Sequence, residues 1–238
     1  MSIKLWSNTA IRFHKLNHKL YIVPTPIGNL ADMTFRAVEI LKSVDTILCE
    51  DTRQSSKLLN FYQISKPLTA IHKMNEYREV DKLIQQIKSG KQFALISDAG
   101  TPLISDPGNI LIDKCIENGI EIDCLPGATA LVPALVNSGF DLSSFVFLGF
   151  PPHKKGRQTF IKSIIAEPKT VVIYESPHRV IKFLQEFIEF NGENRKLSIS
   201  REISKKFEET LRGTAEELLL HFTNKEPIGE FVIVIQSK

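Results

Sequence analysis

Short apolar runs alternate with segments of helical periodicity through the first half of the chain. Such runs indicate strands, because the strands of a parallel sheet are buried on both faces. The predicted strands cover residues 20–23, 46–49, 68–71, 93–97 and 120–125. Apolar residues three or four positions apart predict helices over residues 34–43, 53–61, 76–88 and 107–118, the last with Asp106 as cap and Pro107 at its first position. This alternation predicts a mostly parallel sheet with helices on both faces.

The second half of the chain has a different pattern. After an apolar helical segment at residues 128–136, longer and partly alternating runs predict a mixed α/β lobe. Its predicted strands cover residues 145–150, 170–174, 197–200 and 230–235, and its predicted helices cover residues 158–166, 180–190 and 215–222. We therefore expect an N-terminal α/β domain over residues 20–126 and a C-terminal α/β domain over residues 127–238. Residues 1–19 are basic and contain no acidic residue, a pattern that resembles an organellar transit peptide; we expect instead a flexible leader on a cytoplasmic protein.

Composition narrows the class of protein. The 238 residues are 42% hydrophobic and 24% charged, as in globular proteins, and no apolar run approaches the length of a membrane span. The net charge of +3 does not by itself indicate a nucleic-acid binder, so any RNA site must be a local patch. The three cysteines lie in apolar contexts without metal-ligand spacing, which predicts buried thiols, no metal site and a cytoplasmic protein.

Polar and backbone-shaping residues follow the predicted strands, where open α/β sheets bind their ligands. The segment 98–108 holds two Asp, two Gly and two Pro directly after a buried strand. Glycine permits a close approach of backbone to ligand, and proline stiffens a loop. A capped helix start explains Asp106 and Pro107 but not Asp98 or Gly100, so we predict a ligand site. The sequence lacks GxGxxG, GxxxxGK[ST] and GxSxG, which disfavours dehydrogenases, P-loop NTPases and serine hydrolases.

Several motifs, in this order, resemble the RNA-modifying branch of the tetrapyrrole methylase superfamily. They are LYIVPTPIGNL at 20–30, EDTR at 50–53, SDAGTPLISDPG at 97–108, Pro126-Gly127, YESPHR at 174–179, Arg201-Glu202 and GEFVIV at 229–234. The resemblance covers nearly the whole chain from about residue 20 onward. It implies two α/β lobes, S-adenosylmethionine as cofactor, a homodimer, and 2′-O-methylation of a cytidine ribose in 16S rRNA of the small ribosomal subunit.

The same resemblance implies which residues bind the cofactor. Segments matching 98–108, 126–129 and 174–176 approach S-adenosylmethionine within the superfamily. The expected cofactor-binding residues are Pro26, Asp98, Ala99, Gly100, Thr101, Pro102, Leu103, Asp106, Pro107, Pro126, Gly127, Ala128, Tyr174, Glu175 and Ser176.

Methylation of a ribose hydroxyl, a poor nucleophile, is helped by a side chain that accepts its proton. The candidate bases are Glu50, Asp51, His72, Glu76 and Asp98. We expect Glu50, Asp51 and Arg53 to form the catalytic group, with one carboxylate facing the substrate and the other orienting Arg53. For Asp51, a helix-capping role is an equally good interpretation.

RNA phosphates require local positive charge. The expected RNA-binding residues are Lys154, Lys155, Arg157, Arg179 and Arg201. For the two lysines a role in solubility stays open, and for the arginines at strand ends structural salt bridges stay open. Longer members of the family carry a helical extension after the last strand, whereas this chain ends at Lys238, so we expect these basic residues and a partner subunit to hold the RNA.

Two other functions remain alternatives. Methylases of tetrapyrrole or corrinoid (precorrin-type) synthesis usually carry a glycine-rich loop after the first strand, where this chain has PTPIGN at 24–29. A non-catalytic RNA-binding assembly factor would not need intact loops after several strands. Residues 128–136 hold more apolar residues than one buried helix face requires, which also favours a homodimer.

Overall fold

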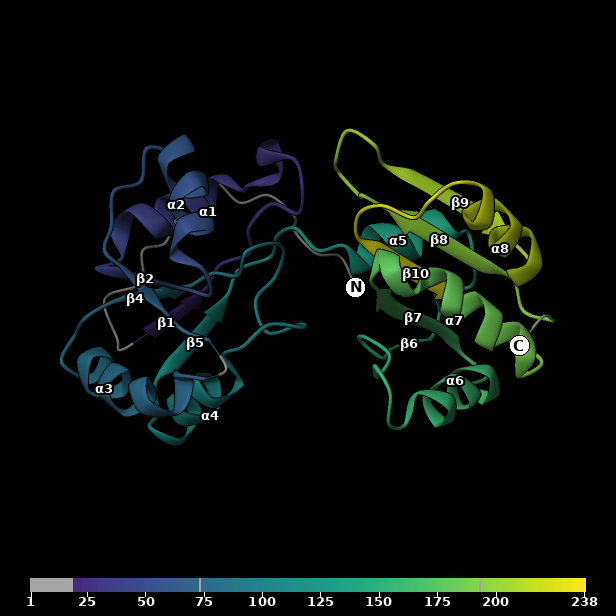
Figure 1. Ribbon diagram of the computed structural model, residues 1–238. Coiled ribbons are helices and arrows are strands. Elements are labelled where there is room, and N and C mark those ends of the chain that lie inside the picture. Colours follow the sequence, from purple (N-terminus) through teal and green to yellow (C-terminus); the bar gives the residue numbers. More distant parts are fainter. Residues whose placement is uncertain (1–18, 73, 193) are drawn as a thin grey trace, which may run out of the picture. The chain divides into compact units, whose positions relative to one another are not determined.

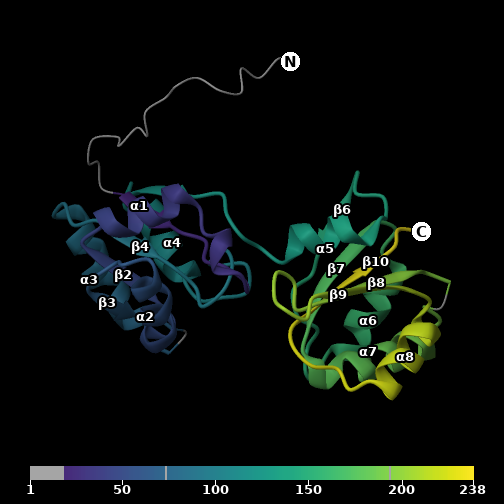
Figure 2. The ribbon, with the colours of Figure 1, turned by 90° about the horizontal axis from the view of Figure 1, so that it is seen from above.

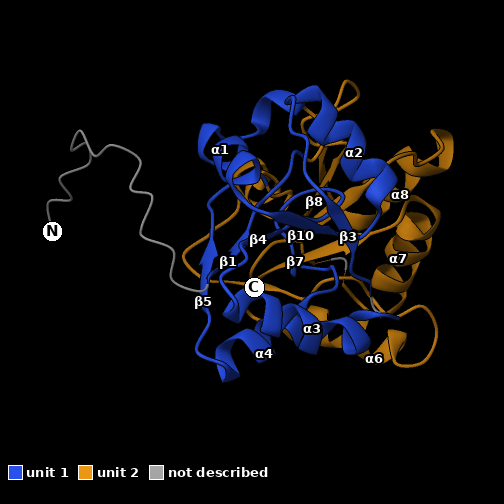
Figure 3. Cartoon of the chain, turned by 90° about the vertical axis from the view of Figure 1, so that its left-hand side faces the viewer, with its two compact units in different colours: residues 1–26, 30–128 blue, residues 27–29, 129–238 orange. Residues whose placement is uncertain are grey.

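The computed structural model describes residues 19–72, 74–192 and 194–238. The chain divides into two compact units, coloured separately in Figure 3. The first unit contains residues up to 26 and 30–128, and the second contains residues 27–29 and 129–238. The chain thus passes into the second unit two residues beyond the expected boundary. The short segment 27–29 joins the second unit because Ile27 packs against that unit's core, a contact that the local pattern does not reveal.

The first unit is built on a five-stranded parallel sheet of order β3-β2-β4-β1-β5 (Figure 1). Its strands are β1 (Lys19–Ile22), β2 (Thr46–Cys49), β3 (Leu68–Ala70), β4 (Phe93–Leu95) and β5 (Glu121–Cys124). Lys19, assigned to the leader from sequence, instead opens β1 and forms ion pairs with Glu121 and Asp123 of β5. The rest of the expected leader lies outside the described residues. Because all five strands are parallel, their carboxyl ends lie along one edge of the sheet.

Helices cover both faces of this sheet, which confirms the predicted architecture (Figure 1). Ile47 and Cys49 of β2 pack on one face, whereas Leu48 packs on the other, as the two-residue period of a strand requires. The helices of the first face are α1 (Phe35–Ser43) and α2 (Thr52–Phe61), and those of the second are α3 (Glu76–Lys88) and α4 (Asn109–Glu117). A short 3-10 helix, η1 (Leu30–Asp32), precedes α1.

The start of α4 differs from the sequence prediction. The helix begins at Asn109 after Gly108, whose φ of 127° favours glycine, and not at Pro107 under an Asp106 cap. The buried carboxylate of Glu76, at the start of α3, accepts hydrogen bonds from the Gly108 and Leu111 amides at 3.3 and 3.0 Å. A carboxylate 35 residues away along the chain therefore caps α4.

The second unit contains a mixed sheet of order β6-β7-β10-β8-β9, in which only β6 and β7 pair in parallel. Its strands are β6 (Phe145–Phe147), β7 (Thr170–Glu175), β8 (Leu197–Arg201), β9 (Glu209–Gly213) and β10 (Phe231–Ile235). Its helices are α5 (Leu131–Ser138), α6 (Arg157–Ala166), α7 (Pro177–Glu189) and α8 (Ala215–Asn224). The sequence prediction missed β9, because this edge strand pairs on one side only and contains a single large apolar residue, Leu211.

The two faces of the second sheet are covered unequally (Figure 2). Helices α6, α7 and α8 pack on one face, where Phe183, Phe187 and Phe231 lie in the core. The opposite face packs against α5 through Ala134 and Leu135. Near the carboxyl end of β7, aromatic side chains are more exposed than those in the core: Phe150 is exposed and Tyr174 is partly exposed.

Two expectations from composition meet different outcomes. Cys49 and Cys115 are buried, but Cys124 is exposed because it lies on the edge strand β5, so the expectation of three buried thiols was wrong. Of the described helices, none is long and apolar enough to cross a membrane.

Candidate functional site

Three loops at the carboxyl edge of the first sheet are hydrogen-bonded to one another. The loops follow β4, β1 and β5, which are neighbours in the sheet. Thr25 and Gly100 exchange two backbone hydrogen bonds of 2.9 Å, and the Thr25 hydroxyl donates to the carbonyl of Ser97 at 3.0 Å. The Thr101 hydroxyl donates to the carbonyl of Ala128 at 3.1 Å, which joins the loop after β5. The segments 24–26, 97–101 and 126–128 thus form one braced surface.

Close packing of backbone reinforces this surface. The Ser97 hydroxyl donates to the carbonyl of Gly100 at 3.1 Å, and Gly100 itself has a φ of 80°, a conformation that favours glycine. A Cβ placed on Gly127 would lie 2.5 Å from the Cβ of Pro24, so only glycine allows the loops after β1 and β5 to approach this closely. Both glycines are therefore required by the geometry of the loops themselves.

The braced surface has a buried floor and an exposed rim. Of the cofactor-binding residues expected in this unit, the buried ones are Pro26, Gly100, Pro102 and Pro107; the exposed ones are Asp98, Ala99, Pro126 and Gly127; and the partly exposed ones are Thr101, Leu103, Asp106 and Ala128. Leu103 has a φ of 77°, which is costly for a non-glycine residue and marks strain in the middle of the longest loop. Asp98 is an exposed carboxylate on a rigid support.

The sequence reasoning did not single out Thr25 and Ser97 as site residues. Each is at least 97% buried; the Thr25 hydroxyl binds the backbone of the neighbouring loop, and the Ser97 hydroxyl binds the backbone of its own loop. A polar residue at the end of an apolar strand is the signal that could have found them, because a buried hydroxyl needs a hydrogen-bond partner. They hold the loops in place without facing solvent.

The end of β2 carries the expected catalytic group. Asp51 is the N-cap of α2. Its carboxylate accepts a hydrogen bond from the Arg53 amide at 2.8 Å and forms an ion pair with the Arg53 guanidinium at 2.6 Å. These hydrogen bonds from Arg53 lower the pKa of Asp51 to about 2. Because so weak a base accepts protons poorly near neutral pH, the geometry favours the capping and Arg53-orienting interpretations of Asp51 over that of a general base. Glu50 beside it is exposed.

Two further candidate bases have structural roles or partners. Glu76 is 4% exposed and its carboxylate caps α4, so it does not face a substrate. His72 follows β3 in a turn: its backbone amide donates to the Asn75 side chain at 2.8 Å, and the imidazole is partly exposed. The pKa of the Cys49 thiol is raised mainly by burial, which removes the thiol from water. The nearby carboxylates of Asp98 and Asp51 raise it further.

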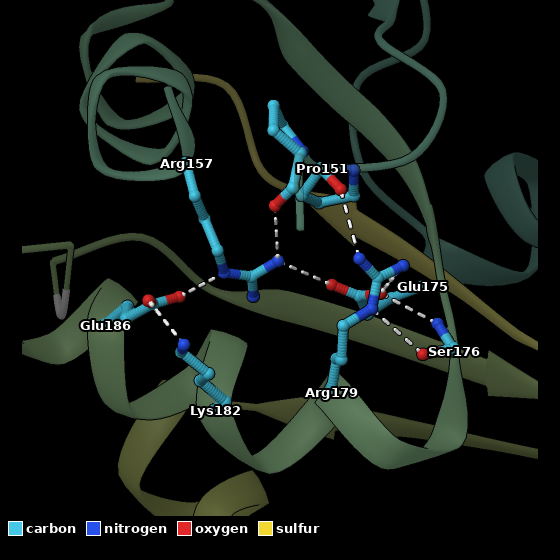
Figure 4. Close-up of polar contacts among 8 residues, drawn as sticks. Pro151, Arg157, Glu175, Ser176, Arg179, Lys182 and Glu186 are labelled. Carbon is cyan, nitrogen blue, oxygen red and sulfur yellow. Dashed lines mark hydrogen bonds and ion pairs between the residues drawn. The ribbon is translucent and has the colours of Figure 1, made fainter. Parts of the chain in front are cut away.

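The end of β7, in the second unit, holds a buried ion cluster (Figure 4). The Glu175 carboxylate, 0% exposed, pairs with Arg157 at 3.2 Å and with Arg179 at 2.8 Å, and it accepts a hydrogen bond from the Ser176 amide at 2.8 Å. Arg157 also pairs with Glu186 of α7 at 2.7 Å. We call Arg157, Glu175, Arg179 and Glu186 the β7 ion cluster. Because both Glu175 oxygens are engaged, its carboxylate is a structural centre and does not face a ligand.

This cluster changes the interpretation of the expected RNA-binding residues. Arg157 is 3% exposed, so the expectation that it contacts phosphates is wrong: its guanidinium lies inside the unit between two carboxylates. The Arg179 side chain is 15% exposed and the Arg201 side chain 13% exposed, and Arg201 pairs with Glu209 at 2.7 Å. For Arg179 and Arg201, the arginines at strand ends, the structure supports the salt-bridge alternative. Lys154 and Lys155 are exposed.

Tyr174 and Ser176 flank the buried Glu175 and are partly exposed. The Tyr174 ring packs edge-on against Phe147 and Phe150, with ring centroids 4.9 and 5.5 Å apart. Tyr174, Glu175 and Ser176 belong to the second unit, whereas the other expected cofactor-binding residues belong to the first. Within the described residues, no group of three or more His, Cys, Asp or Glu is placed to hold a metal ion.

Comparison with known proteins gives the chain its relatives. The sequence pattern of the family described as Tetrapyrrole (Corrin/Porphyrin) Methylases matches residues 19–219. A protein of Thermotoga maritima named ribosomal RNA small subunit methyltransferase I is 44% identical over 220 residues, which cover 92% of this chain and 99% of the relative. A Synechocystis protein of the same name is 45% identical over 217 residues, covering 91% of this chain and 78% of the relative.

Solved structures agree at the level of the fold. The crystal structure of a diphthine synthase aligns with a TM-score of 0.72 over 92% of this chain and 90% of that chain, at 13% sequence identity. At so low an identity the likeness concerns the fold alone.

Proposed function

The chain belongs to the family of tetrapyrrole (corrin/porphyrin) methylases and, within it, to the ribosomal RNA small subunit methyltransferases I; from that premise we propose that it methylates the 2′-hydroxyl of a cytidine ribose in 16S rRNA, with S-adenosylmethionine as methyl donor. Relatives of that name, 42–45% identical over most of the chain, carry this proposal. The tetrapyrrole alternative shares only the superfamily. Because the substrate is part of the ribosome, we also propose that the protein acts in the cytoplasm.

The residues of the braced surface suit S-adenosylmethionine chemically. Its sulfonium and ammonium groups outweigh its one carboxylate, so the cofactor is cationic, and the exposed carboxylate of Asp98 complements that charge. Ala99, next to Asp98 in the chain, and Gly127, in the loop after β5, offer backbone without bulky side chains. The proposed cofactor-binding surface of the first unit therefore consists of Asp98 with the rims of the loops after β1 and β5.

When bound, S-adenosylmethionine supplies a methyl group already activated on sulfur. The task that remains for the chain is to align the ribose oxygen with that methyl group and to exclude water, which can contribute about 7–11 kcal/mol to lowering the barrier. Hydrogen bonds among Thr25, Ser97 and Gly100 fix the loops before any ligand arrives, so little ordering remains to be done on binding.

Glu50 is the carboxylate that we propose accepts the ribose proton. It is exposed at the end of β2, beside Asp51, whose own oxygens are engaged by Arg53. Asp51 then acts on Arg53, an 87% exposed guanidinium that it holds with hydrogen bonds of 3.1 and 2.6 Å to Nε and Nη2. A guanidinium held in this way can position a phosphate beside the reacting ribose.

The proposed reaction is tested by methyl transfer from isotopically labelled S-adenosylmethionine. Purified small ribosomal subunits, free 16S rRNA and a porphyrinoid are offered separately, and we expect label in RNA only. The labelled nucleotide should be a cytidine whose 3′ linkage survives alkali, because a 2′-O-methyl group blocks the hydroxyl that attacks the phosphate. Label in the porphyrinoid contradicts the proposal. Label in a nucleotide whose 3′ linkage is cleaved by alkali also contradicts it, because the 2′-hydroxyl of that nucleotide is not methylated.

We also propose that the protein is a homodimer, supported by the exposed face of α5. Ala134 and Leu135 bury one face of this helix, whereas Val132 and Val136, one turn apart, are 52% and 64% exposed. Apolar side chains grouped on an outer helix face favour burial against a partner.

Replacing Val136 with glutamate is expected to convert the dimer to monomer at micromolar concentration, because a carboxylate buried in an apolar interface lacks a partner. Light scattering measures the mass. Leu220→Glu is the matched control, since Leu220 is 65% exposed on α8 of the same unit. A wild-type chain that is monomeric, or a Val136→Glu variant that stays dimeric, contradicts this assignment.

A further inference from the structure

The β7 ion cluster holds one particular loop. The Arg157 guanidinium donates to the carbonyl of Pro152 at 3.4 Å, and the Arg179 guanidinium donates to the carbonyl of Pro151 at 3.2 Å (Figure 4). Both arginines also bind Glu175. The loop between β6 and α6 is therefore fixed to the end of β7 by two guanidinium groups that share one buried carboxylate.

The cluster is not arranged as stability alone would arrange it. The Arg157 Nη2 atom is buried, and no hydrogen-bond partner for it exists within the described part of the chain. A buried ion pair is weak evidence for stability, and an unmet donor adds a cost. Apolar residues of similar size would fill this space at a lower cost in free energy, so we attribute the arrangement to the loop position that it fixes.

What the cluster holds in place is aromatic and basic. Phe150, next to the two prolines, is 50% exposed, and its ring packs against that of Tyr174 with the centroids 5.5 Å apart. The preceding Gly149 has a φ of 65°, and its carbonyl accepts a hydrogen bond from the Tyr174 amide at 3.0 Å. This hydrogen bond fixes the backbone immediately before Phe150. His153, Lys154 and Lys155 follow, all exposed, and residues 150–156 contain no acidic side chain.

We propose that residues 150–155 form a platform for a single-stranded nucleotide of the RNA substrate, with an unpaired base stacked on Phe150 and phosphates at Lys154 and Lys155. Exposed aromatic rings beside lysines are what single-stranded RNA requires, because every base has a stacking face and every nucleotide a charge. Glu175, Arg157 and Arg179 are positioning residues of this platform. The inference rests on the proposed function, since it concerns how the same RNA is held.

The platform is tested with a fluorescently labelled oligocytidylate, whose binding is followed by anisotropy, and with small ribosomal subunits in the methylation assay. Phe150→Ala should weaken oligonucleotide binding about tenfold, within the range measured for loss of one base–aromatic stack. Phe150→Tyr should restore it. Phe145→Ala is the control, because Phe145 is a similarly exposed (43%) aromatic residue of the same unit on β6.

Salt dependence separates the lysines from the ring. Lys154→Gln with Lys155→Gln should reduce the slope of log affinity against log salt by about 1.4, because each phosphate contact on a single strand contributes about 0.7. Phe150→Ala should leave the slope unchanged. None of these variants should change the affinity for S-adenosylmethionine, measured by calorimetry.

Positioning is tested by combining variants. Arg179→Ala frees the Pro151 carbonyl, so it should weaken RNA binding, and adding it to a variant that already combines Phe150→Ala with Lys154→Gln and Lys155→Gln should cause little further loss. Lys182→Ala is the control on the same helix, since Lys182 lies 3.9 Å from Glu186 and is 59% exposed. Additive losses, or a Phe150→Ala variant that binds and methylates RNA like the wild type, overturn the platform and leave the methyltransferase standing. A wild-type chain that neither binds nor methylates RNA overturns the proposed function itself.

Discussion

Replacing Glu175 with alanine is expected to lower the free energy of unfolding of the second unit by about 3–5 kcal/mol, the usual cost of breaking a buried ion pair by removing one partner. The carboxylate is 0% exposed, and its loss leaves Arg157, which is 3% exposed, with one of its two carboxylate partners. Arg179 loses its ion pair as well.

Hydrogen exchange measures this effect where it arises. The amides of β7 and α7 should exchange faster by the factor that corresponds to the lost free energy, whereas those of β1 and β4 in the first unit should be unaffected. Lys182→Ala is the matched control: it removes an exposed cation 3.9 Å from Glu186, and surface ion pairs of that kind contribute at most about 1 kcal/mol. A Glu175→Ala loss no larger than that of the control would show that the cluster is solvated and does not hold the loop.

Replacing Asp98 with asparagine is expected to weaken binding of S-adenosylmethionine by about 10- to 100-fold. The substitution keeps the size of the side chain and removes its charge, and a hydrogen bond to a charged group contributes about 1.5–3 kcal/mol. Asp98 is exposed on a loop whose neighbours Ser97 and Gly100 are fixed by hydrogen bonds, so the variant should fold normally. Calorimetric titration with the cofactor measures the affinity without any RNA present.

The control for Asp98 is Asp113→Asn, on the exposed surface of α4 in the same unit. It removes an equal charge from the same unit and should leave the affinity within about twofold, because exposed charges far from a ligand are screened by salt. If Asp98→Asn binds the cofactor as tightly as this control, Asp98 does not contact it, and the recognition of its positive charge must lie elsewhere.

The layered architecture of the first unit could be predicted from the sequence. A strand buried on both faces must be apolar throughout, so runs such as residues 46–49 indicate a parallel sheet without further information. The period of α3 and its end before Gly90, whose φ is 98°, are local properties as well. The location of the ligand loops follows, because the carboxyl ends of parallel strands share one edge.

Elements whose stability comes from neighbours could not be predicted in the same way. Strand β9 has no apolar pattern of its own, because it lies at the sheet edge and is held by its pairing with β8. The start of α4 was misplaced because its capping carboxylate, Glu76, comes from another helix. Capping by a distant side chain leaves no trace in the residues around the helix start.

The roles of individual charged side chains show the division most clearly. The sequence by itself determined that Lys154, Lys155 and Arg157 lie close together after a strand, and the motifs that it contains indicated the family. Only the tertiary structure decided that the lysines face solvent while Arg157 lies between Glu175 and Glu186, 18 and 29 residues away. The physical reason is that a charge becomes structural or functional according to its partners and its burial, and distant segments supply both only when the chain folds.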